Sequence, residues 1–185
     1  DGICRLLQLR RVAFVASEKP EMSVSAKTNQ VEADMIAAMV ERIFRQADRF
    51  DYSATVGVIV PYRNQIATVR NAIDRYGIPA LHSITIDTVE RFQGSQRDYI
   101  IYGLTVQQRC QLNFLTDNVF EEDGTLIDRK LNVAMTRARK HLTIVGNPDI
   151  LAGSAVYRRL MDFMKSRGCY FNVACEKFCA GDFSV

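Results

Sequence analysis

The stretch LNVAMTRARKHLTIVGN, Leu131 to Asn147, joins a helical pattern directly to an apolar strand pattern. At about 100° per residue, its first part places a group of apolar residues on one face of a helix. We expect this core stripe to contain Leu131, Ala134, Met135 and Ala138. The run HLTIVGN that follows is apolar on successive residues, which is typical of a strand covered on both faces. The stretch therefore predicts a helix that leads into a buried parallel strand.

Similar elements precede this stretch and follow it. Short apolar runs rich in branched residues predict further strands at RVAFVAS from Arg11, TVGVIVP from Thr55, SITIDTV from Ser83 and DYIIYGLTV from Asp98. Apolar residues at helical spacing predict helices at Asn29 to Ala47, Arg63 to Tyr76 and Ser154 to Ser166. In the last of these we expect Val156, Leu160 and Met164 to be buried. This alternation predicts a doubly wound α/β domain, with a mostly parallel sheet of about five or more strands flanked by helices.

Two stretches lack a clear period. Gln107 to Leu126 is polar and contains an acidic run, so we expect a long surface loop. Phe171 to Val185 shows no periodicity, and we expect a tail or the start of a linker. The predicted domain therefore covers residues 1–170, and the tail covers 171–185.

The composition limits the class of protein. The 185 residues are 48% hydrophobic, which suits one domain with a core, and the net charge is only +3. Any contact with nucleic acid must therefore be local. The five cysteines form no CxxC pair, so we expect free thiols and no metal site. No apolar run approaches the ~20 residues that span a bilayer, so we expect no membrane contact and a cytoplasmic location.

Arg137 is the first candidate for chemistry. It falls on the flank of the predicted core stripe, whereas Arg139 points to nearly the opposite side. A planar guanidinium on a rigid element can bind phosphate oxygens in bidentate fashion and stabilise a transferring phosphoryl group. The alternative is an ordinary surface salt bridge to Asp128 or Glu90.

A second polar cluster follows the strand that ends at Val60. Pro61, Tyr62 and Arg63 stand where the strand stops, and ligands of open α/β sheets bind at the carboxyl ends of strands. An aromatic ring beside an arginine suits stacking on a base and contact with a phosphate. The alternative is that Pro61 only ends the strand and Arg63 is solvated.

A third cluster lies in TIDTVERFQGSQRD, Thr85 to Asp98. Gly94 permits the backbone approach that a phosphate-facing turn needs, and Gln96 offers an amide to ribose or phosphate oxygens. Thr88 and Val89 end a strand with a hydroxyl and a backbone amide suited to a nucleic-acid phosphate. A single glycine turn is weak evidence by itself.

Taken in order, VPYRNQ, VERFQGSQRD and LNVAMTRARKHLTIVGN resemble three elements of the second RecA-like domain of superfamily 1 helicases. The resemblance covers roughly Arg11 to Gly168 and is to the branch that includes the nonsense-mediated mRNA decay helicase and the replication nuclease-helicase. An ordered triple is far more specific than any one motif. It implies a RecA-like domain of the P-loop NTPase type that lacks the P-loop.

The resemblance also implies roles for particular residues. Arg137 matches the arginine finger that reaches the γ-phosphate of ATP, and Gly94 matches a glycine at the nucleotide edge of the cleft. Gln96 stands where the family usually has a glutamate facing the ribose hydroxyl, so we expect altered nucleotide discrimination. Thr88 and Val89 match positions that touch the strand backbone. The remaining nucleic-acid positions that match are Pro61, Tyr62 and Arg63.

Asn29 and Glu32 complete the expected nucleotide site. The segment KTNQVEA, Lys27 to Ala33, resembles a family element close to the base and phosphates. Independently of the resemblance, Asn29 fits a helix N-cap and Glu32 fits its third-position partner in a capping box.

The chain has no GxxxxGK[ST] loop and no strand that ends in an Asp-Glu pair. The family keeps both in its first RecA-like domain, which would hold ATP and Mg²⁺ and which this chain lacks. We therefore expect one half of an ATP-dependent motor on single-stranded DNA or RNA, inactive alone and partnered by the first RecA-like domain of the same polypeptide. The alternatives are a non-catalytic helicase-like module that binds nucleic acid or a partner protein, and a freestanding nucleotide-binding domain.

Overall fold

In a computed structural model of the chain, which describes residues 1–20, 25–92, 95–117, 119–122 and 125–185, six parallel strands form one sheet. Their order is β3-β2-β4-β7-β1-β8. The strands are β1 (Val12–Ala16), β2 (Val56–Val60), β3 (Thr85–Thr88), β4 (Arg97–Gly103), β7 (Ala138–Gly146) and β8 (Tyr170–Asn172). The predicted α/β class and the five predicted strands are confirmed.

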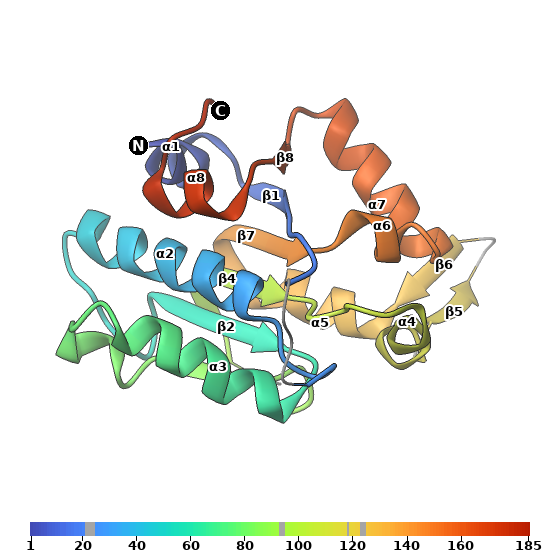
Figure 1. Cartoon of the computed structure of the whole chain (residues 1–185), viewed down its shortest axis with the longest axis horizontal. Helices are drawn as coiled ribbons and strands as arrows, with labels where there is room; N and C mark the ends of the chain where they lie inside the picture. The colour runs from blue at the N-terminus through green and yellow to red at the C-terminus, as the bar shows by residue number, and fades with distance from the viewer. Residues whose placement is uncertain (21–24, 93–94, 118, 123–124) are drawn as a thin grey trace.

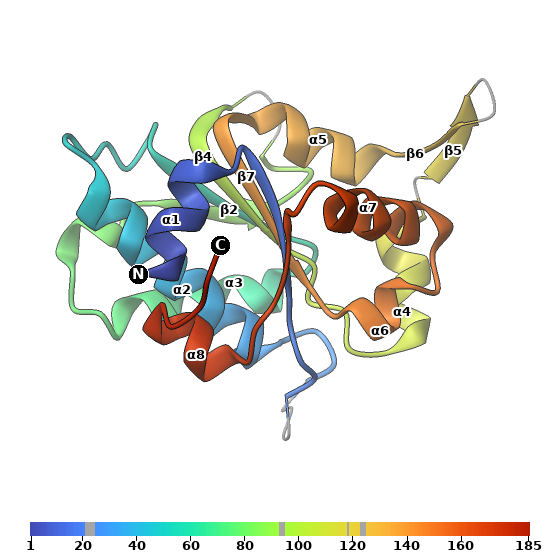
Figure 2. The ribbon, with the colours of Figure 1, turned by 90° about the horizontal axis from the view of Figure 1, so that it is seen from above.

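Alternating side chains of the strands divide the core into two layers. In β1, Ala13 and Val15 face one layer and Phe14 and Ala16 face the other, and all four are buried. The first layer contains α1 (Gly2–Leu9), α2 (Gln30–Gln46), α3 (Arg63–Asp74) and α8 (Cys175–Ala180). The second contains α4 (Arg109–Leu115), α5 (Arg129–Arg137), α6 (Pro148–Leu151) and α7 (Ala155–Ser166). Figures 1 and 2 show these two sets of helices on opposite faces of the sheet.

The three helices predicted from periodicity are present within one or two residues of their expected ends, as α2, α3 and α7. A short 3₁₀ turn at Pro79–Leu81 leads from α3 toward β3. In α7 the fully buried positions are Tyr157, Met161 and Met164, whereas the predicted Val156 and Leu160 are half-buried. The helix was therefore placed correctly, with its apolar face rotated by about one residue.

The predicted core stripe of α5 is only partly correct. Leu131 and Ala134 are buried, but Met135 is 48% exposed and Ala138 already belongs to β7. The helix has only nine residues, about two and a half turns, and the chain enters β7 directly after Arg137. The helical apolar period therefore ends before Ala138, and Met135 lies on the partly exposed side of the last turn.

The expectation of a long loop at Gln107 to Leu126 was wrong. The segment forms α4 and most of an antiparallel hairpin of β5 (Val119–Glu122) and β6 (Thr125–Asp128), which projects from the body of the protein in Figures 1 and 2. Leu112 and Leu115 are spaced by three residues and bury one face of α4. A seven-residue helix is too short for this period to stand out among polar neighbours.

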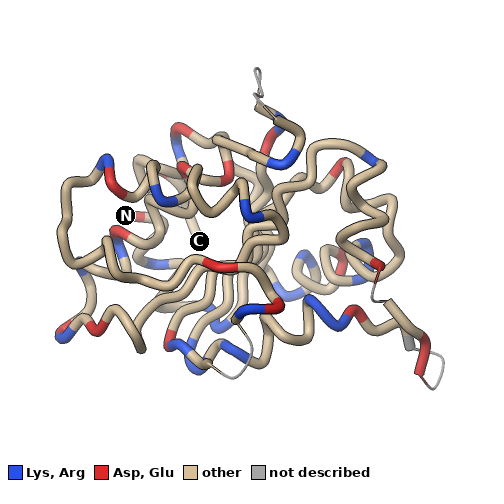
Figure 3. Tube along the Cα trace, turned by 90° about the horizontal axis from the view of Figure 1, so that it is seen from below, with Lys and Arg blue, Asp and Glu red and all other residues tan. Residues whose placement is uncertain are grey.

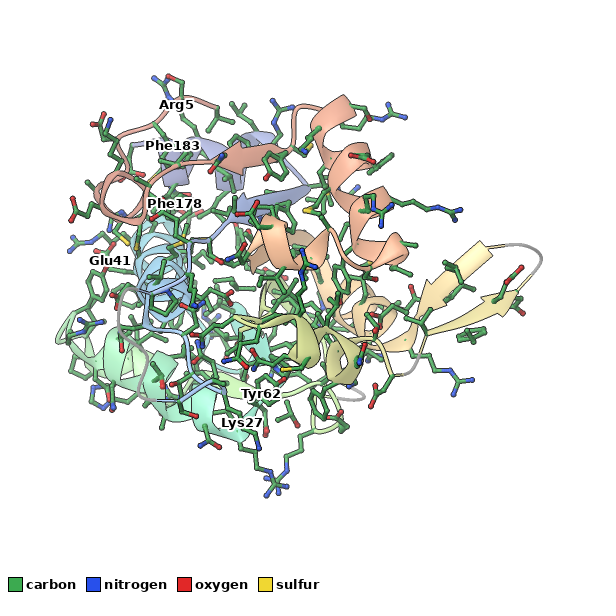
Figure 4. All side chains as sticks on the ribbon, turned by 45° about the vertical axis from the view of Figure 1, so that its right-hand side comes forward. Arg5, Lys27, Glu41, Tyr62, Phe178 and Phe183 are labelled. Atoms are coloured by element: carbon green, nitrogen blue, oxygen red, sulfur yellow. The ribbon has the colours of Figure 1, made fainter. Side chains whose placement is uncertain are left out.

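The expectation of a tail after residue 170 was also wrong. β8 pairs with β1 at the edge of the sheet, and α8 buries Phe178 completely. The Phe178 ring stacks on the Phe183 ring with the centroids 5.1 Å apart. Figure 4 labels the two residues close to one another. The backbone amide of Gly2 donates to the carbonyl oxygen of Gly181 at 2.7 Å, so the two ends of the chain lie together.

Replacing Phe178 with alanine should lower the free energy of unfolding by about 3–5 kcal/mol, because it leaves a cavity in the first core layer. The matched control is Phe163→Ala in α7, where the ring is 51% exposed and the expected change is within about 0.5 kcal/mol. Urea unfolding of the two variants measures both values. Equal stability of Phe178→Ala and the wild type would mean that α8 does not belong to the core.

Candidate functional site

The predicted nucleic-acid residues lie at the carboxyl edge of the sheet. Because the strands are parallel, the residues that follow them share one edge, which includes Ser17 after β1, Tyr62 after β2, Thr88 at the end of β3 and Thr105 after β4. Helix α2 begins at this edge too, with its N-cap at Asn29. Along the Cα trace in Figure 3, Lys and Arg positions are interspersed with Asp and Glu positions, which fits the small net charge.

The buried Glu32 carboxyl ties the carboxyl ends of two strands to α2. Its Oε1 accepts from the Ser17 hydroxyl at 3.1 Å, and its Oε2 accepts from the backbone amide of Thr105 at 2.8 Å. Thr105 has a positive φ of 61°, a strained backbone for a β-branched residue. Gly103 lies beneath the carboxyl, and a Cβ there would come within 2.7 Å of Ile36 Cδ1.

Burial raises the pKa of Glu32 from 4.5 to about 8, because desolvation of the carboxylate outweighs the hydrogen bonds from Thr105 and Ser17. Glu32 is therefore neutral at neutral pH in the folded protein. A neutral carboxyl costs far less to bury than a carboxylate without a counter-charge.

Asn29 caps α2 as predicted, but the capping box is not reciprocal. The Asn29 side-chain oxygen accepts from the backbone amide of Glu32 at 3.1 Å. The backbone amide of Asn29, however, donates to Gln65 Oε1 at 2.8 Å and not to the Glu32 side chain. Gln65 Nε2 donates back to the Asn29 carbonyl at 2.9 Å, so this side chain satisfies both backbone groups of the cap. The two hydrogen bonds link the starts of α2 and α3.

Pro61, Tyr62 and Arg63 differ in what they present to solvent. Pro61 is buried and Tyr62 is only 9% exposed, whereas Arg63 is exposed at the start of α3. One reason for the burial of Tyr62 is Phe114 of α4, whose ring stacks on it with centroids 5.0 Å apart and planes 17° apart. Phe114 was not among the predicted site residues.

Thr88 and Val89 also lie at the carboxyl edge, where they are 7% and 4% exposed. The Thr88 carbonyl accepts from the amides of Arg91 and Phe92 at 3.1 and 3.0 Å, which closes a turn after β3. This edge therefore collects all five predicted nucleic-acid positions. Of these, Arg63 is the exposed side chain.

Gln96 and Arg137 lie at the opposite, amino edge of the sheet. Gln96 precedes β4 and Arg137 precedes β7, and the first residues of these strands, Arg97 and Ala138, are register partners. Gln96 Nε2 also donates to the carbonyl of Thr136, 3.4 Å away. The structure thus brings Gln96 to the end of α5. Gly94 lies outside the described residues.

The side chain of Arg137 is half-buried at the last position of α5. Its Nε atom is buried and has no hydrogen-bond partner, and no carboxylate forms an ion pair with it within the part of the chain that the structure describes. The alternative salt bridge to Asp128 is not formed, because Asp128 caps α5 at its other end. Arg139 instead lies 3.9 Å from Asp98.

The expected nucleotide site therefore divides between two edges. Asn29 and Glu32 adjoin the end of β4, and Gln96 and Arg137 adjoin its beginning. The seven residues of β4 separate these positions by about 23 Å. Asn29 and Glu32 have no exposed surface and are engaged by the chain's own groups, so in this structure they hold helices and strands together rather than face a nucleotide.

Several residues that organise the carboxyl edge were missed by sequence reasoning. Gln111 Oε1 accepts from the backbone amides of Gln107 and Gln108 at 2.9 and 3.0 Å, which fixes the start of α4. The side chains of Gln107 and Gln111 reach the carbonyl of Ala26, ahead of α2. Isolated glutamines carry no spacing signal, and these contacts span more than 80 positions in sequence.

The model of one family, described as an AAA domain, matches residues 6–149 of this chain. The chain is 32% identical to the Schizosaccharomyces pombe protein "Helicase sen1" over 159 residues, which is 85% of the chain and 9% of that protein. It is 32% identical to the Drosophila melanogaster "Regulator of nonsense transcripts 1 homolog" over 167 residues, 85% of the chain and 13% of that protein. The Danio rerio "Putative helicase mov-10-B.2" is 31% identical over 124 residues, 64% of the chain and 12% of that protein.

The chain thus spans only about a tenth of the length of each of these relatives. Among the described residues, no helix combines the length and the apolar character needed to cross a membrane.

Glu32→Gln should reduce the dependence of stability on pH. The folded wild type binds more protons than the unfolded chain between about pH 4.5 and about pH 8, so its free energy of unfolding should fall as the pH rises through this window. The amide keeps the shape of the neutral carboxyl and cannot ionise, so the variant should lose this slope and be the more stable protein above about pH 8.

Urea unfolding at about pH 5 and about pH 9 measures the effect. Asp34→Asn, at a half-buried carboxylate of the same helix, is the control, and it should keep the wild-type slope. If the free energy of unfolding depended on pH equally in the wild type and in Glu32→Gln, Glu32 would not change its protonation on folding.

Proposed function

Since the chain belongs to the AAA domain family and, within it, to the second RecA-like domain of superfamily 1 helicases, we propose that it is one half of an ATP-dependent motor on single-stranded nucleic acid. It would close over ATP and Mg²⁺ that are held mainly by the first RecA-like domain of the same polypeptide. The strand would run along the carboxyl edge of the sheet. The resemblance implies movement from 5′ to 3′ along the strand, which we propose together with a cytoplasmic location.

The observation that carries the proposal is the state of Arg137. It sits at the end of a helix that is fixed at its start, where Asp128 Oδ1 accepts from the amides of Lys130 and Leu131 at 2.8 and 3.1 Å. Its guanidinium has no carboxylate partner among the described residues and retains a buried Nε without a hydrogen bond. A half-buried cation in this state is suited to receive an anion from outside the domain.

The chemistry of this edge fits a triphosphate. The guanidinium of Arg137 would donate to oxygens of the γ-phosphoryl group and stabilise the charge that develops as the group is transferred to water. Gln96 would hydrogen-bond to the ribose through the amide that now reaches Thr136. Gly94 is proposed to line the same edge, by resemblance alone.

The carboxyl edge has the groups for a strand backbone. Arg63 is exposed there. Thr88 and Val89 lie at the end of the neighbouring strand β3, where their backbone groups could contact a phosphate. Pro61 and Tyr62 would shape this surface from beneath, and Asn29 and Glu32 would hold its helices in place. Phosphate contacts of this kind do not distinguish DNA from RNA.

Arg137→Ala in the complete motor should reduce strand-stimulated ATP hydrolysis by about 10³-fold or more, because an arginine finger contributes about that factor. ATP binding should change much less, since the first domain would hold most of the nucleotide. Steady-state hydrolysis and equilibrium nucleotide binding separate the two effects. The matched control is Arg139→Ala, which removes an exposed guanidinium two residues away and should leave turnover intact.

Full hydrolysis by Arg137→Ala, with unchanged nucleotide binding, would contradict the proposed role. Absence of strand-stimulated hydrolysis in the wild-type protein would instead favour the alternative, a non-catalytic helicase-like module that binds nucleic acid or a partner protein.

Gln96→Glu should raise the preference of the motor for ATP over 2′-deoxy-ATP, because a carboxylate accepts more strongly from the ribose hydroxyl than an amide does. The ratio of kcat/KM for the two nucleotides measures the preference. Glu90→Gln, at an exposed position on the turn after β3, provides the control. An unchanged ratio would place Gln96 away from the ribose.

A further inference from the structure

The two stacked rings at the carboxyl edge, Tyr62 and Phe114, differ in their exposure to solvent. Tyr62, at the end of β2, is 9% exposed, whereas Phe114 of α4 is 45% exposed. The rings are stacked with centroids 5.0 Å apart and nearly parallel planes. Solvent, and any ligand at this edge, therefore reaches the Phe114 ring far more readily than the Tyr62 ring.

The Phe114 ring is held in place by contacts besides the stack. Lys130 Nζ lies 4.3 Å from the ring centroid and donates to the Phe114 carbonyl at 2.8 Å. This lysine is itself 5% exposed and forms an ion pair with Asp117 at 2.9 Å. Single exposed phenylalanines are common on protein surfaces, but an exposed ring fixed by a buried cation and a second ring is preorganised for contact.

The helix that carries Phe114 is fixed to the rest of the edge. Gln107 and Gln111 connect its start to the Ala26 carbonyl, and Lys27 next to it is exposed. Tyr62 and Lys27 extend toward the same margin of the protein in Figure 4. Arg109, at the start of α4, is exposed as well. Exposed cations from separate segments thus accompany an exposed ring on the elements that these hydrogen bonds connect, a combination that single-strand binding uses.

We propose that Phe114 is the residue on which a base of the bound strand stacks, with Tyr62 as its support from below. This inference rests on the proposed function, and it transfers the base contact that the sequence assigned to Tyr62 to a residue outside the matched motifs. Stacking of a base on an aromatic ring contributes about 1–3 kcal/mol and tolerates any base sequence. Phe114 would thus add affinity without selecting a sequence, and Arg63 would add the phosphate contact.

Phe114→Trp gives a direct test, because the sequence contains no tryptophan. The single indole of this variant should lose emission, in a saturable manner, when oligothymidylate or oligouridylate of about 12 nucleotides is added to the 185-residue chain. The matched control is Phe163→Trp, at a ring of similar exposure on α7, whose emission should not change.

Substitutions then separate stacking from charge. Phe114→Ala should weaken binding of the same oligonucleotides about tenfold or more with an unchanged dependence on salt, whereas Phe163→Ala on α7 should bind as the wild type does. Arg63→Ala should instead lower the slope of log affinity against log salt by about 1. Fluorescence anisotropy with labelled oligonucleotides measures each variant.

The outcomes distinguish this inference from the proposed function. Strand binding by the wild type, with unchanged emission of Phe114→Trp and full affinity of Phe114→Ala, would overturn the role of Phe114 and leave the motor proposal standing. Absence of binding to either oligonucleotide at low salt would contradict the strand surface itself and the inference that rests on it. If Phe114→Ala fails to fold, saturable quenching of the indole in Phe114→Trp would still support the contact.

Discussion

The buried carboxyl of Glu32 is the interaction on which the carboxyl edge depends. It joins the residue after β1 to the residue after β4, although β7 lies between these strands in the sheet. It also holds Thr105 in a left-handed backbone conformation that a threonine rarely adopts. Helix α2 is capped by Asn29, which is linked to Gln65 of α3. The Glu32 carboxyl and the Asn29–Gln65 hydrogen bonds therefore position the starts of both helices against the strand ends. The surface that surrounds Tyr62 and Phe114 is built on that framework.

The same parallel sheet separates two kinds of chemistry. Residues after the strands collect at the carboxyl edge, and residues before them collect at the amino edge, with the length of β4 between the two. Helix α5 is about 13 Å long and ends at the amino edge, where it leads directly into β7. Its start carries Lys130, which contacts Phe114, and its end carries Arg137. A rigid nine-residue element thus connects the proposed strand surface with the proposed phosphate contact.

Much of the fold could be predicted because it depends on local patterns. Apolar runs in the sequence predicted five strands of the sheet, and the helical spacing of apolar residues predicted α2, α3 and α7. Elements with weak local signals were missed. Helix α4 has only about two turns, and the three residues of β8 form a strand because they pair with β1. The arrangement of the candidate site was predictable where a motif is contiguous, as for the position of Arg137 on a helix that leads into a strand. It was not predictable where contacts are long-range, as for the ring of Phe114 on Tyr62, or where burial decides the role, as for Glu32.

We propose that nucleotide and strand meet this domain at opposite edges of one sheet. The sharpest test is a structure of the complete motor with a single strand, ADP and a fluoride mimic of the γ-phosphoryl group. We expect the Arg137 guanidinium within about 2.7–3.2 Å of the mimic and the strand across the carboxyl ends of β2 and β3, in contact with Arg63. A strand that runs along the edge formed by Gln96 and Arg137, or an Arg137 that faces solvent in that closed state, would contradict it.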